Sequence, residues 1–214
     1  MVTDKNQPHK SKITIICMVL LAMLSGFKLY KSIVKPNDAK DCLPCISYYE
    51  SKEYEKAYRT CSELASKGNI YAKAMLASLY EDGLYVQQDF DLAEKLYTEA
   101  VNDQSNQTAR SAGCFGLGGL YMRKDFPKHD LKVSANWYKL SADQGMKQSQ
   151  LKYGTMLFLG YGTEKNTELA KAYLQKASKN GLKKEADTIL SVINSPDAHA
   201  AREEILKLLD NRKK

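Results

Sequence analysis

The sequence predicts an all-α protein, an α-solenoid of stacked antiparallel helix hairpins with a C-terminal capping helix, preceded by an N-terminal membrane helix. Small residues recur at Ala57, Ala93, Ser134 and Ala170, in steps of 36, 41 and 36 residues, and such a period is typical of helical-hairpin repeats. The apolar residues around them are spaced by three and four, as on helices with one buried face. One long uncharged apolar run lies near the N-terminus.

The composition is that of an ordinary folded protein and excludes a disordered or collagen-like chain. Of the 214 residues, 43% are apolar and 27% are charged, with a formal net charge of +7. Part of the excess lies in Lys28, Lys31 and Lys35, where it suits anionic lipid headgroups. Beyond them Lys and Glu are interspersed, so we expect no nucleic-acid partner.

The N-terminal segment predicts export to, or insertion in, a membrane. An uncharged run from Ile13 to Phe27 follows a polar tail, residues 1–12. Its length of 15 also fits a cleaved signal peptide, but no small-x-small cleavage site follows and hydrophobicity resumes after Lys28. We therefore expect an uncleaved signal anchor over residues 13–34 and a linker over 35–40. Cleavage of this segment stays an open alternative.

The orientation of that anchor does not follow from charge alone, because lysines flank both of its ends. A short tail before a long domain usually leaves the domain outside the cytoplasm. We therefore expect a single-pass protein of the bacterial inner membrane, with a repeat domain over residues 41–214 that faces the periplasm.

The first hairpin, residues 41–68, contains three cysteines. Cys42, Cys45 and Cys61 are disulfide candidates: in an oxidising compartment Cys42 or Cys45 would bridge to Cys61, and in a reducing one all three would be buried thiols. The sequence has no second Cys-x-x-Cys motif and its histidines are isolated, so we expect no metal site.

Three further hairpins are expected at 70–104, 109–145 and 147–181, with the polar stretch 102–108 as a surface loop. Gly68, Gly145 and Gly181 stand where helices end, a position that favours glycine. Glycine inside a helix costs about 1 kcal/mol relative to alanine, so Gly118 and Gly154 need a packing reason, such as the close approach of a neighbouring helix.

The capping region, residues 183–214, completes the predicted array. Residues 183–193 continue as a helix, and Ser195-Pro196 supplies an N-cap followed by proline at the first helical position. The next helix carries Ala201, Ile205 and Leu208 on one side. An amphipathic terminal helix is the expected end of a solenoid.

The three central units together resemble the Sel-1-like repeat, a relative of the tetratricopeptide repeat. The residues that match its pattern fall in three segments: Ala72, Leu76, Tyr80, Gly83, Val86, Asp89, Ala93, Tyr97 and Ala100; Leu117, Gly118, Tyr121, Asp130, Trp137, Tyr138, Ala142 and Gly145; and Gly154, Gly160, Gly162, Ala170, Ala177 and Gly181. The first hairpin, with its short turn, is closer to a plain tetratricopeptide hairpin. The resemblance implies a protein-binding solenoid.

Catalytic motifs are not found in the chain. It contains no nucleophile elbow, phosphate loop, dinucleotide fingerprint or His-Glu-x-x-His motif. The glycines of Gly116–Gly119 lie in a helical register without a following Lys-Ser or Lys-Thr, which favours packing over phosphate binding. We therefore expect neither enzymatic activity nor a cofactor.

By the resemblance, a partner protein or peptide would bind in a concave groove formed by the first helix of each unit. The partner-binding candidates are Tyr71, Ser78, Glu81, Asp82, Phe115, Met122, Arg123, Gln148, Leu151, Thr155 and Phe158. As an alternative, Phe115, Leu151 and Phe158 pack between units. Two functions fit: a membrane-tethered adaptor of the bacterial envelope, or a periplasmic immunity protein that neutralises a secreted toxic effector such as a type VI phospholipase.

Overall fold

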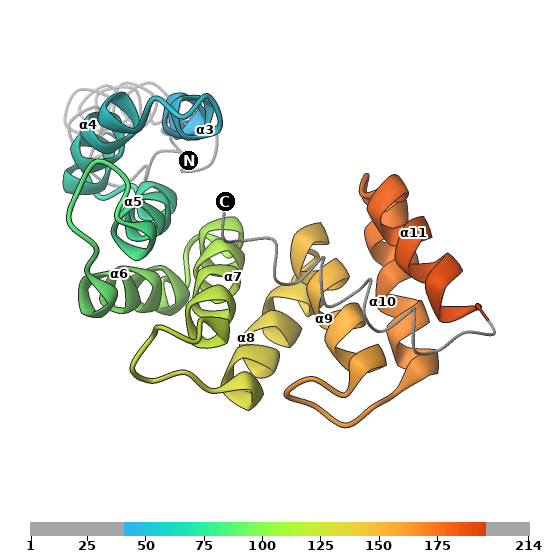
Figure 1. The fold of residues 1–214 in the computed structure, drawn as a ribbon. Helices are drawn as coiled ribbons and strands as arrows, with labels where there is room; N and C mark the ends of the chain where they lie inside the picture. The colour runs from blue at the N-terminus through green and yellow to red at the C-terminus, as the bar shows by residue number, and fades with distance from the viewer. Residues whose placement is uncertain (1–40, 196–214) are drawn as a thin grey trace, which may run out of the picture. The chain divides into compact units, whose positions relative to one another are not determined.

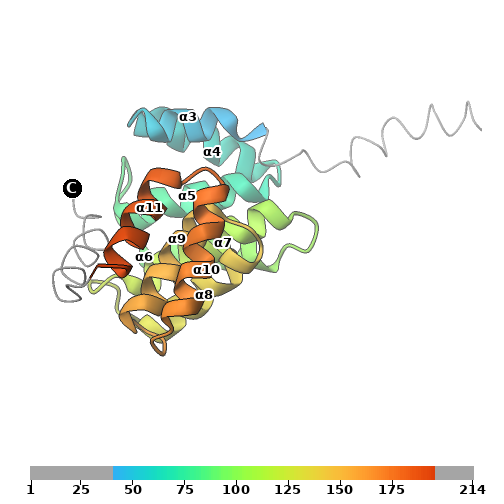
Figure 2. The same ribbon diagram turned by 90° about the vertical axis from the view of Figure 1, so that its right-hand side faces the viewer.

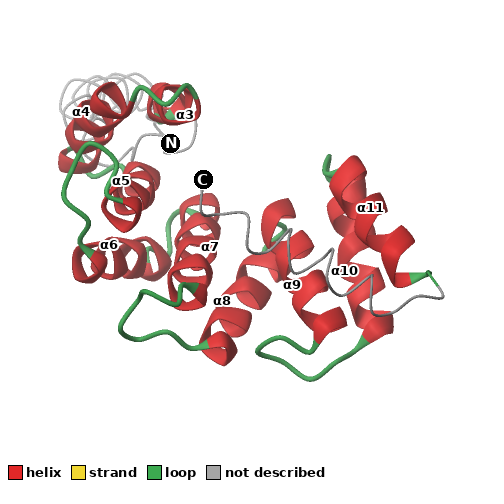
Figure 3. Cartoon of the chain, in the orientation of Figure 1, coloured by secondary structure: helices red, strands yellow, loops and turns green. Residues whose placement is uncertain are grey.

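The computed structural model describes residues 41–195, which form nine helices and no strand (Figures 1 and 3). The helices are α3 (Leu43–Glu50), α4 (Tyr54–Ser66), α5 (Ile70–Asp82), α6 (Phe90–Asn102), α7 (Gln107–Met122), α8 (Leu131–Asp143), α9 (Lys147–Leu159), α10 (Thr167–Lys179) and α11 (Lys183–Ile193). The predicted all-α repeat fold is confirmed. The predicted membrane segment, and the capping helix after Pro196, lie outside the described residues.

None of the helices within residues 41–195 is both long and apolar enough to span a lipid bilayer.

Side-chain caps fix where most of the hairpin helices begin. In five helices an Asn or Asp just before the first turn accepts a hydrogen bond from a backbone N–H of that turn; these residues are Asn69, Asp89, Asn106, Asp130 and Asn166. Each cap satisfies a donor that the helix itself leaves without a partner. After α4, α8 and α10, the glycines predicted to end helices have left-handed backbone angles, with φ of 87°, 96° and 102° for Gly68, Gly145 and Gly181.

Consecutive helices pack against one another in chain order, from α3 against α4 to α10 against α11. Figure 1 shows them stacked side by side in this order, and Figure 2 shows the same helices from the side on which α11 lies. Alternate helices also touch, α3 with α5, α5 with α7, and α9 with α11, whereas any contact between α7 and α9 is slight. We call α3, α5, α7, α9 and α11 the inner row, and α4, α6, α8 and α10 the outer row.

The core is divided along the array rather than gathered at one centre. One cluster of buried side chains joins α5, α6 and α7, and includes Tyr97 and Leu117. A second joins α8, α9 and α10 around Tyr138 and Met156. Smaller clusters lie at the two ends, around the three cysteines and around Leu174. Each hairpin therefore depends mainly on its neighbours, as in other repeat proteins.

Small residues permit this close stacking. The four small residues that recur along the sequence are fully buried, at 0% exposure: Ala57, Ala93, Ser134 and Ala170. A Cβ atom added at Gly118 would lie 2.9 Å from the ring of Tyr138, and one added at Gly154 would lie 3.0 Å from Leu174 Cγ. The predicted packing role of both glycines is confirmed.

The loop predicted at 102–108 is shorter in the structure. Helix α7 already begins at Gln107, because the Asn106 side chain accepts a hydrogen bond from the backbone N–H of Ala109 at 3.0 Å. Only Asp103–Asn106 remain between α6 and α7. The polar composition of this stretch concealed an N-cap, which is why the sequence alone placed the start of the helix too late.

Gly116 offers a direct test of the stacking. A Cβ there would lie 2.1 Å from the Tyr97 ring, and that ring is 2% exposed and held by hydrogen bonds, so it cannot move aside at low cost. We expect Gly116→Ala to lower the free energy of unfolding by about 1–3 kcal/mol, measured by urea denaturation. Thr108→Ala, at an exposed position of the same helix, is the control and should change it by less than about 0.5 kcal/mol. Equal effects of the two changes would contradict the packing account.

Candidate protein-binding face

The predicted partner-binding residues come together on three neighbouring helices of the inner row. Tyr71, Ser78, Glu81 and Asp82 lie on α5; Phe115 and Met122 lie on α7, with Arg123 as its C-cap; Gln148, Leu151, Thr155 and Phe158 lie on α9. They divide into a polar part on α5 and at the end of α7, and a mainly apolar part on α7 and α9. We call the two together the inner face.

Arg123 is the centre of the polar part. Its Nη1 donates to Asp82 Oδ1 at 2.7 Å and lies 3.8 Å from Glu81 Oε1, while Nη2 lies 2.9 Å from Asp125 Oδ2. Its guanidinium carbon also lies 5.3 Å from the centre of the Phe90 ring. These contacts tie the end of α7 to the end of α5, so Arg123 is a structural residue as well as a binding candidate.

Glu81 is a buried carboxylate, 6% exposed, within this network. The Tyr97 hydroxyl donates to its Oε2 at 2.8 Å, and the Ser78 hydroxyl lies 2.9 Å from the Tyr97 oxygen. Burial, and then the charge of Glu81, raise the pKa of Tyr97 well above its usual value, so Tyr97 keeps the proton that it donates. Glu81 therefore stabilises the residues of the inner face, and its carboxylate is not presented to a partner.

Tyr49 of α3 extends the network to the end of the array. Its hydroxyl donates to Asp82 Oδ2 at 3.4 Å, and burial raises its pKa, assisted by the charges of Asp82 and Glu81. Sequence reasoning missed both Tyr49 and the hydroxyl of Tyr97 as members of this site. The repeat pattern identifies an aromatic position but not the polar atom that its hydroxyl reaches.

Large, half-buried side chains form the apolar part. The Phe115 ring packs edge to face on Tyr138, with the ring centres 5.6 Å apart. Met122 packs on the same cluster, and Phe158 packs on it and on the terminal cluster, where Leu151 also lies. Lys165 Nζ lies 5.8 Å from the centre of the Phe158 ring. These side chains fill space between units while keeping part of their surface exposed.

The remaining candidates differ in exposure. Gln148 is exposed, whereas Thr155 is buried, at 2% exposure, and donates to the Leu151 carbonyl at 2.7 Å. Tyr71 is half-buried and packs on the cluster of α5 to α7 and on the cysteine cluster, and burial raises its pKa. Gln148, Tyr71, Asp82 and the exposed parts of the larger side chains therefore make up the accessible surface of the inner face.

The three cysteines of the first hairpin form one buried cluster, with Cys42 and Cys45 at 0% exposure and Cys61 at 1%. Hydrogen bonds with the thiols of Cys42 and Cys61 lower the pKa of Cys45, whereas hydrogen bonds with Cys42 and Cys45, followed by burial, raise the pKa of Cys61. The cluster lies between α3, α4 and Ala72 of α5. Bridging of Cys61 to one of the other two stays a prediction.

Other reactive chemistry is sparse in the described part of the chain. Within residues 41–195, no group of three or more His, Cys, Asp or Glu side chains is arranged to hold a metal ion. The fourth described cysteine, Cys114, is buried, and burial raises its pKa to about 11, which keeps the thiol protonated at neutral pH.

Comparison with known families agrees with this repeat geometry. The model of the Sel1 repeat matches residues 70–104, 111–146 and 147–182, which together make up half of the chain. The chain belongs to the Sel1 repeat family. The crystal structure of a Sel1 repeat protein from Oxalobacter formigenes is similar to it, with a TM-score of 0.55, 27% identity, and coverage of 70% of this chain and 60% of that one. Sel1 repeats generally form non-enzymatic scaffolds for protein–protein interaction.

Two curated relatives carry the name "Exopolysaccharide production negative regulator". The protein from Rhizobium meliloti (strain 1021) is 29% identical over 145 residues, 64% of this chain and 54% of that protein. The protein from Rhizobium leguminosarum bv. viciae is 26% identical over 143 residues, 62% of this chain and 53% of that protein. This Sel1 repeat chain thus spans about half the length of the curated relatives it matches.

The Glu81–Arg123 pair predicts a measurable coupling. Arg123→Met takes the arginine cation away from the buried Glu81 carboxylate and should lower the free energy of unfolding by about 2 kcal/mol, less than for a fully buried pair because Arg123 is partly exposed. Adding Glu81→Gln removes the buried charge, so the double variant should be more stable than the sum of the single changes predicts, by about 1 kcal/mol in a double-mutant cycle. Strict additivity would show that the two groups do not interact.

The cysteine cluster predicts a disulfide when the protein is made in an oxidising compartment. The bridge would close a loop of about 15–20 residues and stabilise the first hairpin by about 3 kcal/mol, so a reductant should lower the melting temperature. Under non-reducing conditions, mass spectrometry should find tryptic peptides 41–52 and 60–67 joined. Cys61→Ser should abolish the response to reductant, and Cys114→Ser should keep it. Recovery of both peptides as unlinked thiols would refute the bridge.

Proposed function

We propose that this chain is a membrane-tethered regulatory adaptor of the bacterial envelope, which binds one partner protein on its inner face and so restrains the production of an extracellular polysaccharide. The observation that carries this proposal is the inner face itself. Aromatic, methionine and arginine side chains, which are enriched at protein interfaces, are gathered there on neighbouring helices: Tyr71, Phe115, Met122, Arg123 and Phe158.

The names of the two curated relatives support the regulatory part of the proposal. Both are called negative regulators of exopolysaccharide production, and the matched stretch covers more than 60% of this chain. A repeat scaffold without its own chemistry would restrain such a process by holding a protein that promotes it. The apolar segment at 13–34, which lies outside the described residues, supports tethering at the inner membrane with the repeats in the periplasm.

The two parts of the inner face suggest how a partner would be held. The apolar part would bury an apolar surface of the partner, which supplies most of the binding free energy. In the polar part, Arg123 and Asp82 are already paired, so their charges would orient the partner rather than anchor it. Gln148, exposed at the start of α9, would lie at the rim.

Isolation of the full-length protein from its own envelope tests the proposal. Mild crosslinking followed by purification and mass spectrometry should yield one dominant stoichiometric protein, and deletion of the gene should raise exopolysaccharide production. A small secreted toxin as the dominant protein, with unchanged polysaccharide, would instead show an immunity protein. Recovery of no specific protein would contradict both functions.

Matched substitutions locate the binding surface. Phe158→Ala and Gln148→Arg on the inner face should weaken binding of the purified partner by about tenfold or more, because they remove an anchor and place a charge at the rim. Leu169→Ala is the control, since Leu169 is an apolar residue of similar size, 40% exposed, on outer-row α10. Melting temperatures recorded in parallel separate lost binding from lost folding. A larger effect of Leu169→Ala would place the interface on the outer row.

A further inference from the structure

The charges of the repeat array are separated along the chain. Residues 41–104, which form α3 to α6, carry twelve Asp and Glu against six Lys and Arg, a net charge of −6. Residues 105–195, which form α7 to α11, carry seven against fourteen, a net charge of +7. We call these the acidic half and the basic half. The nearly neutral sum conceals two halves of opposite net charge.

Where the two halves meet within one chain, they form ion pairs. Lys128 of the basic half pairs with Glu94 and, at 3.6 Å, with Asp91, both of the acidic half. Arg123 and Asp82 pair across the same seam at 2.7 Å. Lys128, with the Tyr121 hydroxyl, lowers the pKa of Glu94 although burial opposes the shift. Within one chain, ion pairs therefore already join the two halves over a short stretch of the array.

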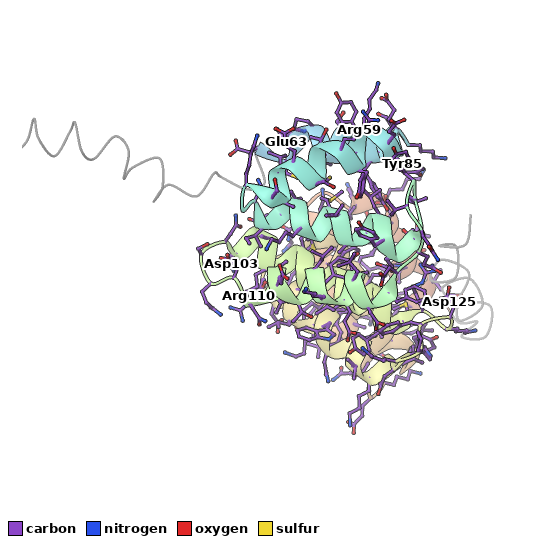
Figure 4. All side chains as sticks on the ribbon, turned by 90° about the vertical axis from the view of Figure 1, so that its left-hand side faces the viewer. Arg59, Glu63, Tyr85, Asp103, Arg110 and Asp125 are labelled. Carbon is purple, nitrogen blue, oxygen red and sulfur yellow. The ribbon has the colours of Figure 1, made fainter. Side chains whose placement is uncertain are left out.

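Away from this seam, some exposed charges of each half have no ion-pair partner within residues 41–195. In the basic half these include Lys132 at the start of α8, and Lys183 and Lys184 at the start of α11. In the acidic half they include Glu50 at the end of α3. Glu63 on α4, labelled in Figure 4, is also exposed and pairs with Lys67 of its own helix.

We propose that two copies of this chain associate in an antiparallel pair, in which the acidic half of each copy faces the basic half of the other. A two-fold arrangement presents the same surface on both copies and joins opposite charges twice. A second copy is the occupant that the charges favour, because it carries both surfaces in the required order, whereas a uniformly charged partner would be attracted by one half and repelled by the other. This association does not depend on which protein the inner face binds.

Light scattering on the full-length protein in a nonionic detergent tests the proposal. At an ionic strength of about 0.01 M, where the screening length is about 30 Å, the protein should be a dimer; at about 1 M, where it is about 3 Å, the dimer should dissociate. A monomer at low salt, or a dimer unchanged at high salt, would overturn the proposal.

Charge-reversed variants test which halves meet. Variant one carries Lys132→Glu, Lys183→Glu and Lys184→Glu, all in first helical turns, where an acidic residue favours the helix. Variant two carries Glu50→Lys and Glu63→Lys, both in last turns, where a basic residue does. The cost to folding should therefore be small, even where Glu63→Lys replaces the pair with Lys67 by like charges, and circular dichroism checks this. Each variant alone should lose the dimer.

Mixing the two variants should restore a dimer that contains one copy of each, because the unchanged acidic half of variant one, net −6, then faces the unchanged basic half of variant two, net +7. The triple Lys→Arg form of variant one is the matched control and should remain dimeric. If the wild-type protein is not a dimer at low salt and instead binds vesicles of anionic lipid, the basic half faces a membrane and not a second copy. Failure of the mixture to dimerise would likewise overturn the antiparallel pairing.

Discussion

The fold depends on the close approach of neighbouring helices, and side-chain size at a few positions controls that approach. Fully buried alanine and serine on the outer row leave room for the inner row, and glycines inside α7 and α9 admit Tyr97, Tyr138 and Leu174. Interiors are packed too densely for an added methyl group to be absorbed without movement. Because each contact lies between adjacent hairpins, the array has no single centre on which all its parts depend.

The same tyrosine that requires a glycine also connects packing to the binding face. The Tyr97 ring lies against Gly116, while its hydroxyl donates to the buried carboxylate of Glu81, which lies beside Arg123. Stacking thereby fixes the position of polar groups at the inner face. A buried charge of this kind is stable only while its partners stay in place, so the face is expected to be rigid rather than adaptable.

Much of the fold could be predicted from the sequence, because the repeat period, the small residues and the helix-ending glycines are local signals. Gly118 and Gly154 fall beneath Tyr138 and Leu174 as the packing argument requires. The start of α7 could not be placed, since Asn106 has the composition of a loop residue until its cap is seen. For the candidate site, the sequence places residues on helices but does not place their atoms: periodicity assigns a residue to a face, but the pairing of Arg123 with Asp82 and Glu81 depends on how adjacent helices are aligned.

The central claim is that the inner row, and not the outer row, contacts a partner protein. Site-specific photocrosslinking in living cells tests it most directly, with a photoreactive amino acid placed in turn at Gln148 of α9 and at Leu169 of α10, both exposed positions. The account predicts a crosslink to one discrete protein from position 148 and none from position 169. A crosslink from position 169 alone would contradict it.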